Sequence, residues 1–292
     1  MDRSNSDSLT VASCLQITDL PRTELRLLLS HLLQQSNSWL IAHDDYRLTS
    51  DQQKQWQTLI QRRQAGEPIA YVLGWRGFWD FEVKVTPDVL IPRHETERLV
   101  EVALEALTSQ GVGSKPAILD LGTGSGIVAI ALTRAYPQAQ VMATDFSEAA
   151  LAIAQENAQR LQASITFIQS DWLADLPTKL DDASMRFDLI VSNPPYIHAQ
   201  DIHLQQGDLR YEPSSALTDG EDGLSDLRTI IFESKRWLKP SGCLWLEHGY
   251  DQGQAVRQLL EEAGYQSIQT HRDLSDHERV SGGIAPLSAL TL

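Results

Sequence analysis

Two short segments of the chain combine residue types that are able to bind a ligand and act on it. The glycine-rich segment Gly122 to Gly126 follows an apolar, strand-like run at residues 117–121. Alternating glycines allow a tight turn that brings backbone N–H groups and a helix N-terminus close to a ligand. The segment Asn193 to Tyr196 follows a second such run at residues 187–192. The first segment is typical of nucleotide-binding loops, and the second is a rigid turn that carries an amide and an aromatic ring.

Acidic residues follow two later strand-like runs. Asp145 follows residues 140–144, near the ~20-residue spacing at which a carboxylate accepts hydrogen bonds from both ribose hydroxyls. Asp171 and Trp172 follow residues 165–169 and offer a carboxylate for an adenine amino group and an aromatic face beside its ring. Each feature alone also fits a plain strand-to-helix turn, a helix N-cap or a core tryptophan. Their placement after three successive strands favours an adenosine-binding slot.

The Asn193 segment suits chemistry on a planar amide, whose nitrogen is a poor nucleophile because its lone pair is delocalised. The Asn193 side-chain oxygen and the Pro194 backbone oxygen can accept hydrogen bonds from the two N–H groups of such an amide and aim its nitrogen. Pro195 would hold the loop rigid, and Tyr196 would pack on the acceptor. No strong general base is needed, because the nitrogen becomes acidic only as its new bond forms. The alternative is a proline-rich turn that only ends a strand.

The remaining sequence must supply the elements that position these residues. Residues 23–35 carry leucines in the i, i+3, i+4, i+7 pattern of an amphipathic helix, and residues 50–64 are typical of a second helix. Residues 68–92 are aromatic and β-branched with interspersed glycines, which indicates a hairpin. After Pro92, strands alternate with helices, which predicts an α/β fold with a mainly parallel, doubly wound sheet. The predicted strands are residues 117–121, 140–144, 165–169, 187–192 and 243–247.

These patterns predict three parts of the chain: an N-terminal helical domain over residues 1–67, a β-hairpin connector over residues 68–92 and an α/β domain over residues 93–292. The composition, 42% hydrophobic and 22% charged, is that of a globular protein. The two cysteines have no CxxC spacing, so we expect neither a disulfide framework nor a metal site. No apolar run approaches the ~20 residues that cross a bilayer, so we expect a cytoplasmic protein without a membrane partner.

The net charge of −15 is concentrated in the part of the chain that holds both motifs. Residues 91–292 contain fifteen Lys and Arg against twenty-eight Asp and Glu, a balance of −13. This charge opposes non-specific attraction to a phosphate backbone, so no direct contact with nucleic acid is expected.

The glycine loop departs from the dinucleotide-binding pattern, because the third glycine of G-x-G-x-x-G would fall on Ile127. The form D-x-G-x-G-x-G, from Asp120 to Gly126, instead resembles motif I of the class I S-adenosylmethionine-dependent methyltransferases. This resemblance implies that S-adenosyl-L-methionine is the cofactor and S-adenosyl-L-homocysteine the product. The residues that it implies for cofactor binding are Asp120, Gly122, Thr123, Gly124, Ser125, Gly126, Asp145, Asp171, Trp172 and Asn193.

The sequence Asn-Pro-Pro-Tyr resembles motif IV of methyltransferases that act on exocyclic or amide nitrogens, including DNA enzymes. Flanking segments narrow this resemblance. With them, the chain resembles the bacterial peptide chain release factor glutamine methyltransferases from about Leu25 to about Val280. The segments are Gly66 to Tyr71, Leu90 to Arg93, Glu95 to Glu97, Leu204 to Asp208 and Leu246 to Gly249.

That family methylates the glutamine N5 of the Gly-Gly-Gln motif in class I release factors, which supports translation termination, and its N-terminal helical domain helps to hold this protein substrate. The resemblance implies a Rossmann-like, seven-stranded sheet with helices on both faces. It implies Asn193, Pro194 and Tyr196 as catalytic residues, and these three with Pro195 as the substrate-binding residues. The alternatives are a nucleic-acid exocyclic-amine methyltransferase and a catalytically silent S-adenosylmethionine-binding module.

Three features near these motifs remain open. Arg93 and Glu95 to Glu97 would lie near the catalytic pocket or form an ion-paired helix start after Pro92. His94 replaces the proline that is usual in the family. The tail from residue 282 to residue 292 lacks the usual aromatic residues of the last strand, which leaves open whether that strand is typical.

Overall fold

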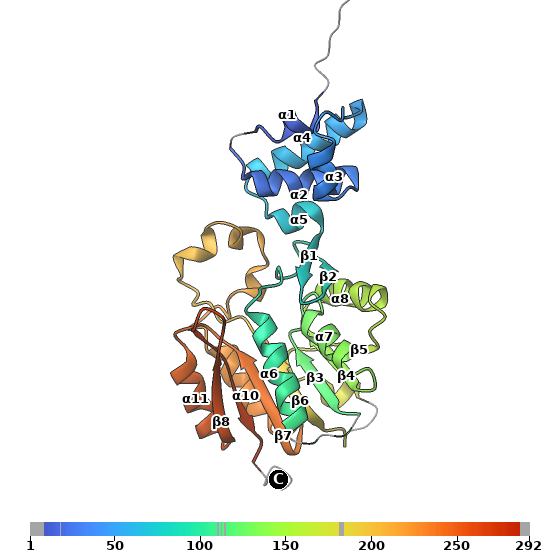
Figure 1. Cartoon of the computed structure of the whole chain (residues 1–292). Helices are drawn as coiled ribbons and strands as arrows, with labels where there is room; N and C mark the ends of the chain where they lie inside the picture. Colours follow the sequence, from blue (N-terminus) through green and yellow to red (C-terminus); the bar gives the residue numbers. More distant parts are fainter. Residues whose placement is uncertain are drawn as a thin grey trace, which may run out of the picture. The chain divides into compact units, whose positions relative to one another are not determined.

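The computed structural model describes residues 9–17, 19–109, 111, 113, 115–180 and 184–286. The chain divides into two compact units, Met1–Gly74 and Trp75–Leu292. Figure 1 shows the helices of the first unit and the mixed helices and strands of the second. Among the described residues, no helix has both the length and the apolar character that a membrane crossing requires.

The N-terminal unit is a group of helices around its own apolar core. The buried face of α2 packs with Trp56 and Ile60 of α4. The helix predicted at residues 50–64 has these bounds, and Thr49 caps its first turn. The helix predicted at residues 23–35 is shorter, because Gln34 adopts a left-handed conformation with φ of 53° and ends it. The helices are α1 (Val11–Cys14), α2 (Arg22–Leu33), α3 (Asn37–Ala42), α4 (Ser50–Gln64) and α5 (Ile69–Leu73).

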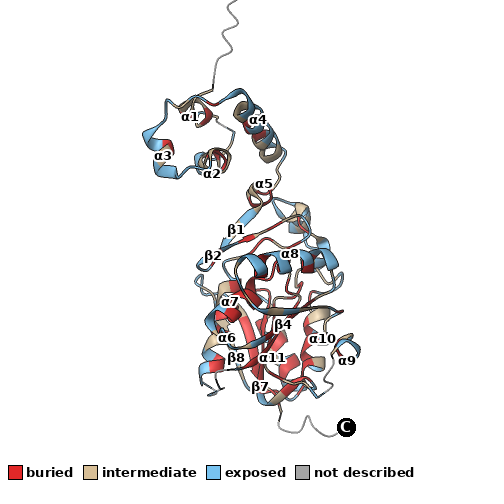
Figure 2. Cartoon of the chain, turned by 90° about the vertical axis from the view of Figure 1, so that its right-hand side faces the viewer, coloured by how far each residue is buried: buried red, intermediate tan, exposed pale blue. Residues whose placement is uncertain are grey.

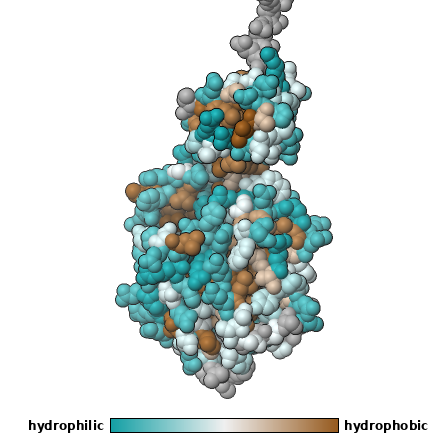
Figure 3. Space-filling view, viewed as in Figure 1, coloured by the Kyte–Doolittle hydropathy of each residue, from teal (hydrophilic) through white to brown (hydrophobic). Residues whose placement is uncertain are grey.

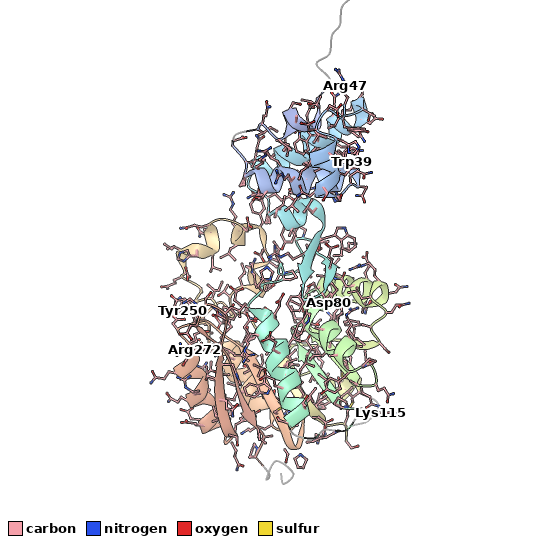
Figure 4. All side chains as sticks on the ribbon, viewed as in Figure 1. Trp39, Arg47, Asp80, Lys115, Tyr250 and Arg272 are labelled. Atoms are coloured by element: carbon pink, nitrogen blue, oxygen red, sulfur yellow. The ribbon has the colours of Figure 1, made fainter. Side chains whose placement is uncertain are left out.

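A β-hairpin begins the second unit. Strands β1 (Trp75–Phe78) and β2 (Phe81–Lys84) pair in antiparallel register, with Trp75 opposite Lys84. Asp80 lies at the turn between them (Figure 4), and its carboxylate is 2.8 Å from the Arg134 guanidinium. The hairpin therefore occupies the middle of residues 68–92, which the sequence predicted as a connector, whereas the helix α5 precedes it in the first unit.

A seven-stranded sheet forms the centre of the described part of the second unit, with strand order β5-β4-β3-β6-β7-β9-β8. Strands β3 to β7 pair in parallel, and β9 is antiparallel to both of its neighbours. Helices α6 and α7 lie on one face of the sheet and α10 on the other (Figure 2). This arrangement confirms the predicted doubly wound, mainly parallel α/β fold.

The strands are β3 (Ala117–Leu121), β4 (Gln140–Asp145), β5 (Ile165–Gln169), β6 (Phe187–Ser192), β7 (Leu238–Glu247), β8 (Gln266–Arg272) and β9 (Glu278–Ile284). The α-helices of this unit are α6 (Thr96–Ser109), α7 (Ile127–Ala135), α8 (Glu148–Arg160), α9 (Leu176–Lys179), α10 (Ser225–Ser234) and α11 (Gly253–Glu262). Short 3-10 helices are η1 (Ile202–Gln205), η2 (Leu209–Tyr211) and η3 (Ser214–Ala216).

Burial explains how well the strands were predicted. All five residues of β3 are buried, as expected for a central parallel strand with helices on both faces. The surface visible in Figure 3 is mostly hydrophilic on this unit, with apolar side chains in small groups.

The predicted strand at residues 243–247 is the second half of a longer β7, and β9 extends to Ile284 within the tail whose last strand the sequence left open. Residues 287–292 lie outside the described residues.

Candidate active site

A cavity of about 550 Å³ lies where β3, β4, β5 and β6 end. Its volume is within the range of small-molecule sites, ~300–1,000 Å³. Parallel strands bring their carboxyl ends to one edge of a sheet, so motifs far apart in sequence meet there. The predicted site residues that line the cavity are Asp120, Gly122, Thr123, Gly124, Ser125, Asp145, Asp171, Trp172, Asn193 and Pro195. The lining does not include Gly126, Pro194 or Tyr196.

The glycine loop has a backbone that side chains would obstruct. Gly122 has a φ of 69°, and a Cβ atom there would lie 3.0 Å from the Trp172 ring. Gly126 has a φ of 87° at the start of α7, where a Cβ atom would lie 3.2 Å from the Cβ of Ala154. Both positions therefore need glycine for conformation and for space. The absence of a side chain at Gly126 allows α7 and α8 to pack close together next to the loop.

Asp120 supports the loop from the end of β3. Its buried carboxyl group accepts hydrogen bonds from the Thr123 hydroxyl at 2.7 Å and from the Ala129 N–H at 3.2 Å. It thereby links the glycine loop to the first turn of α7. Burial raises the pKa of Asp120 to about 7, and the two hydrogen bonds only partly offset this rise.

We expect Asp120 to make the stability of the fold depend on pH. Its pKa rises from an ordinary value of 3.8 to about 7 on folding, so between these values the folded chain holds a proton that the unfolded chain has lost. The stabilising contribution is complete below the lower value and is lost as the pH rises through the upper one. The free energy of unfolding should therefore decline across this window.

The variant Asp120→Asn keeps an oxygen for Thr123 and Ala129 but has no titrating proton. Urea unfolding at several pH values should show a flatter decline for the variant than for the natural chain. Any other buried carboxyl group contributes equally to both curves, so their difference isolates Asp120. Parallel curves would contradict the assignment.

Asp145 ends β4 and is fixed by two backbone donors. One carboxylate oxygen accepts from the Gly124 N–H at 2.8 Å, and the other accepts from the Ser147 N–H at 2.9 Å. Burial is the main cause that raises the Asp145 pKa, while these hydrogen bonds lower it. A carboxylate has about four lone-pair sites, so each oxygen retains the capacity to accept from a ligand.

Trp172 forms one wall of the cavity. It has a φ of 46°, and its indole N–H donates to Asp226 of α10 at 3.2 Å. Asp226 also lines the cavity, and burial raises its pKa. No sequence pattern indicated Asp226, because an acidic residue in the first turn of a helix is ordinary.

The Asn193 segment is held by residues from two other elements. The Asn193 side-chain N–H donates to the Thr96 hydroxyl at 3.1 Å, and Thr96 is the buried first residue of α6. The Tyr196 hydroxyl donates to the buried Glu247 at 3.2 Å. Because the Asn193 side-chain nitrogen donates to Thr96, the side-chain oxygen of Asn193 points away from Thr96. The predicted roles of Pro194 and Tyr196 in contacting an acceptor stay predictions.

Buried polar residues connect the loops around the cavity. Glu212 accepts from the Ile91 N–H at 2.9 Å and forms an ion pair with Arg93, which lines the cavity. Asn157 of α8 is fully buried and donates to the backbone oxygens of Ser125 and Lys84, which ties the glycine loop to β2. Arg93 is therefore both a cavity residue and an ion-paired residue. Neither Glu212 nor Asn157 lies in a motif, so no local sequence signal marks them.

Comparison with known proteins extends these observations. The "PrmC N-terminal domain" family model matches residues 10–74, and the "Methyltransferase small domain" model matches residues 95–208. A methyltransferase structure from Pyrococcus furiosus covers 78% of this chain and 97% of its own at 17% identity, with a TM-score of 0.50. This likeness shows the fold alone.

Close relatives are similar over nearly the whole chain. The release factor glutamine methyltransferase of Bordetella pertussis is 50% identical over 90% of this chain and 95% of its own length. The protein of the same name from Burkholderia pseudomallei is 44% identical over 98% of this chain and 100% of its own length. These identities over almost complete lengths confirm the resemblance that the motifs indicated, and the chain belongs to the release factor glutamine methyltransferase family.

Proposed function

We propose that this chain transfers a methyl group from S-adenosyl-L-methionine to the N5 amide nitrogen of the Gly-Gly-Gln glutamine in class I peptide chain release factors, in the cytoplasm. The observation that carries the proposal is the position of Asn193. Asn193 lines the glycine-loop cavity, and its side-chain nitrogen donates to Thr96 at 3.1 Å. The relatives that match the chain over nearly its full length carry the name of this activity.

The cavity fits the cofactor in several independent respects. Gly122 and Gly124 have positive φ values of 69° and 55° and carry no side chains, so the backbone of the loop lies open to a ligand beside the Trp172 ring. Asp145 retains acceptor capacity for ribose hydroxyls, and the Trp172 ring offers a flat apolar wall for adenine. We assign these residues, with Asp171, to cofactor binding. S-Adenosylmethionine, when bound, supplies an electrophilic methyl group.

The acceptor amide requires orientation more than activation. The Asn193 oxygen and the Pro194 carbonyl oxygen would accept its two N–H groups and direct its nitrogen toward the methyl carbon. The nitrogen would gain a bond to that carbon as the bond from the carbon to sulfur breaks and S-adenosylhomocysteine leaves, and it would lose its proton to water as it becomes acidic. The Arg93 guanidinium pairs with Glu212 and is therefore suited to hold the loop. It is already protonated, so it cannot accept this proton.

We assign the N-terminal helical unit, Met1–Gly74, to holding the protein substrate. The family resemblance implies this role, and residues 10–74 match the "PrmC N-terminal domain" model. The excess of acidic residues from residue 91 onward opposes the nucleic-acid alternative, because it repels a phosphate backbone.

The test is a methyl-transfer assay with labelled S-adenosylmethionine and a purified class I release factor. We expect label on the Gly-Gly-Gln glutamine, located by peptide mass spectrometry, and none when this glutamine is replaced by alanine. DNA and RNA serve as competing acceptors. Label on nucleic acid would favour the first alternative, and cofactor binding without transfer to any acceptor would favour the silent module.

A further inference from the structure

Trp172, which the proposed function assigns to the adenine wall, has a backbone conformation that needs support. Its φ of 46° lies in the left-handed region, which is an outlier for a bulky side chain. Such a conformation persists only where the surrounding structure fixes it. A residue that fixes Trp172 would therefore also fix one wall of the cofactor cavity.

The Trp172 side chain is held at two of its edges. The Cζ3 and Cη2 atoms of its six-membered ring would lie 3.0 and 3.4 Å from a Cβ atom at Gly122, so this edge lies against the glycine loop. The indole N–H, on the five-membered ring, donates to the Asp226 carboxylate at 3.2 Å. This hydrogen bond has a single possible direction, because an indole N–H only donates. Both Trp172 and Asp226 line the cavity.

Packing alone does not require a partner for an indole N–H in this fold. Among the residues that the structure describes, the indole nitrogens of Trp237 and Trp245 are buried and have no hydrogen-bond partner. Trp172 is only half-buried, yet its N–H meets an acceptor that lies 54 residues away in sequence. The fold thus tolerates unpaired indole N–H groups, and the pairing at the cavity wall calls for a separate explanation.

The position of Asp226 is otherwise unfavourable for a carboxylate. Asp226 belongs to the first turn of α10 and is only partly exposed. Burial raises its pKa, the hydrogen bond from Trp172 lowers it, and the negative charges of Asp219 and Asp171 raise it. An acidic residue in the first turn stabilises a helix, but an exposed one does so without the cost of burial. The bond to Trp172 therefore accounts better for a carboxylate at this position.

We propose that Asp226 is a positioning residue for the cofactor: it accepts from the Trp172 indole N–H and thereby holds the ring as the wall against which adenine binds. This inference rests on the proposed function and adds a residue to its cofactor site. Because Asp226 acts through Trp172, its removal should weaken all ligands that contain adenosine by a similar factor. Turnover at saturating cofactor should change little, since other residues hold the Asn193 segment.

The experiment measures dissociation constants of the full-length chain for S-adenosylhomocysteine and for 5′-methylthioadenosine, which carries adenosine without the amino acid. Asp226→Ala removes the acceptor and should raise both constants at least tenfold, roughly the contribution of one hydrogen bond to a charged group. Asp226→Asn keeps an accepting oxygen in a side chain of the same shape, and its constants should stay within about threefold. Both variants lose the charge at the start of α10, so their comparison isolates the hydrogen bond.

The variant Trp172→Phe tests whether Asp226 acts through the indole. Phenylalanine has an aromatic ring but no N–H, so Asp226 has no donor to hold in this variant. Adding Asp226→Ala to Trp172→Phe should therefore raise the dissociation constants by less than about twofold. In nuclear magnetic resonance spectra, the indole N–H signal that is missing from Trp172→Phe should exchange with solvent faster in Asp226→Ala than in the natural chain.

Further measurements separate positioning from general damage. Glu233→Ala removes a carboxylate from the last turn of α10, where Glu233 pairs with Arg236 outside the cavity, and should leave both constants unchanged. Methylation of a release factor by Asp226→Ala should show a raised KM for S-adenosylmethionine and a kcat within about threefold of the natural value. Thermal unfolding identifies variants that lose the fold. If Asp226→Ala does not fold, Asp226→Leu replaces it, because leucine fills the space of the carboxyl group without accepting.

Several results would overturn the inference. Natural affinities in Asp226→Ala would show that the hydrogen bond does not hold the wall. Equal losses in Asp226→Ala and Asp226→Asn would assign the effect to charge. A loss that persists in the Trp172→Phe background would show that Asp226 contacts the ligand directly. A loss for S-adenosylhomocysteine without one for 5′-methylthioadenosine would assign Asp226 to the amino acid part. If the natural chain binds neither ligand, the proposed function itself fails.

Discussion

Replacing Asn193 with alanine is expected to lower kcat for glutamine methylation by about 10²- to 10³-fold, the usual cost of removing one fixed polar group at a reacting centre. The side chain would supply one of two oxygens that hold the acceptor amide. Without it, the nitrogen can rotate away from the methyl carbon, and the advantage of fixed orientation is lost. Thr96 also loses its hydrogen-bond donor, but the cavity walls from β3, β4 and β5 remain.

The measurement is single-turnover methylation of a release factor, combined with titration of S-adenosylhomocysteine into each protein. Cofactor affinity should stay within about threefold, since the proposal assigns the glycine loop, Asp145 and Trp172 to cofactor binding and Asn193 to orienting the acceptor. Thermal unfolding of the variant checks that the fold persists. A kcat equal to that of the natural chain would show that Asn193 has no role in the reaction. A parallel loss of cofactor affinity would show that Asn193 shapes the whole cavity.

The fold was largely predictable because strands of a parallel sheet are buried on both faces. Such strands are short apolar runs that end at polar residues, and residues 117–121, 165–169 and 187–192 have the predicted bounds. Strands β8 and β9 are antiparallel at the sheet edge, and their mixed composition carries a weaker pattern. The resemblance to a family supplied the number of strands, which periodicity alone did not.

The meeting of the proposed cofactor-binding residues at one cavity was also predictable, whereas the residues that support the Asn193 segment were not. Asp145 and Trp172 follow successive strands, so the topology of the sheet brings them to one edge. Thr96 is 97 residues from its hydrogen-bond partner Asn193 in sequence, and Glu247 is 51 residues from its partner Tyr196. Such contacts depend on how the helices pack on the sheet, and no local sequence pattern predicts them. The Tyr196 hydroxyl bonds to one of these supports, and the packing of Tyr196 on the acceptor stays a prediction.

Asp145→Asn is expected to raise the dissociation constant for S-adenosylmethionine about 100-fold. The carboxylate accepts from both Gly124 and Ser147, and the proposed ribose contacts would use its remaining lone pairs. An amide has only one oxygen, so one backbone N–H would face an NH₂ group and the loop would lose a fixed contact. Hydrogen bonds to a charged group contribute ~1.5–3 kcal/mol each, and ~1.4 kcal/mol corresponds to a tenfold change in affinity.

Isothermal titration with the cofactor and with S-adenosylhomocysteine measures this effect, and Glu148→Gln is its matched control. Glu148 is exposed at the start of α8 and loses the same charge three residues later without lining the cavity. The cofactor affinity of Glu148→Gln should match that of the natural chain. The comparison therefore separates long-range charge effects from direct contacts. At saturating cofactor the Asp145→Asn variant should keep kcat within about tenfold, because Asp145 binds the donor and does not orient the acceptor. Equal affinities for the two variants would exclude Asp145 from the cofactor site, whereas a loss confined to kcat would assign it to the acceptor.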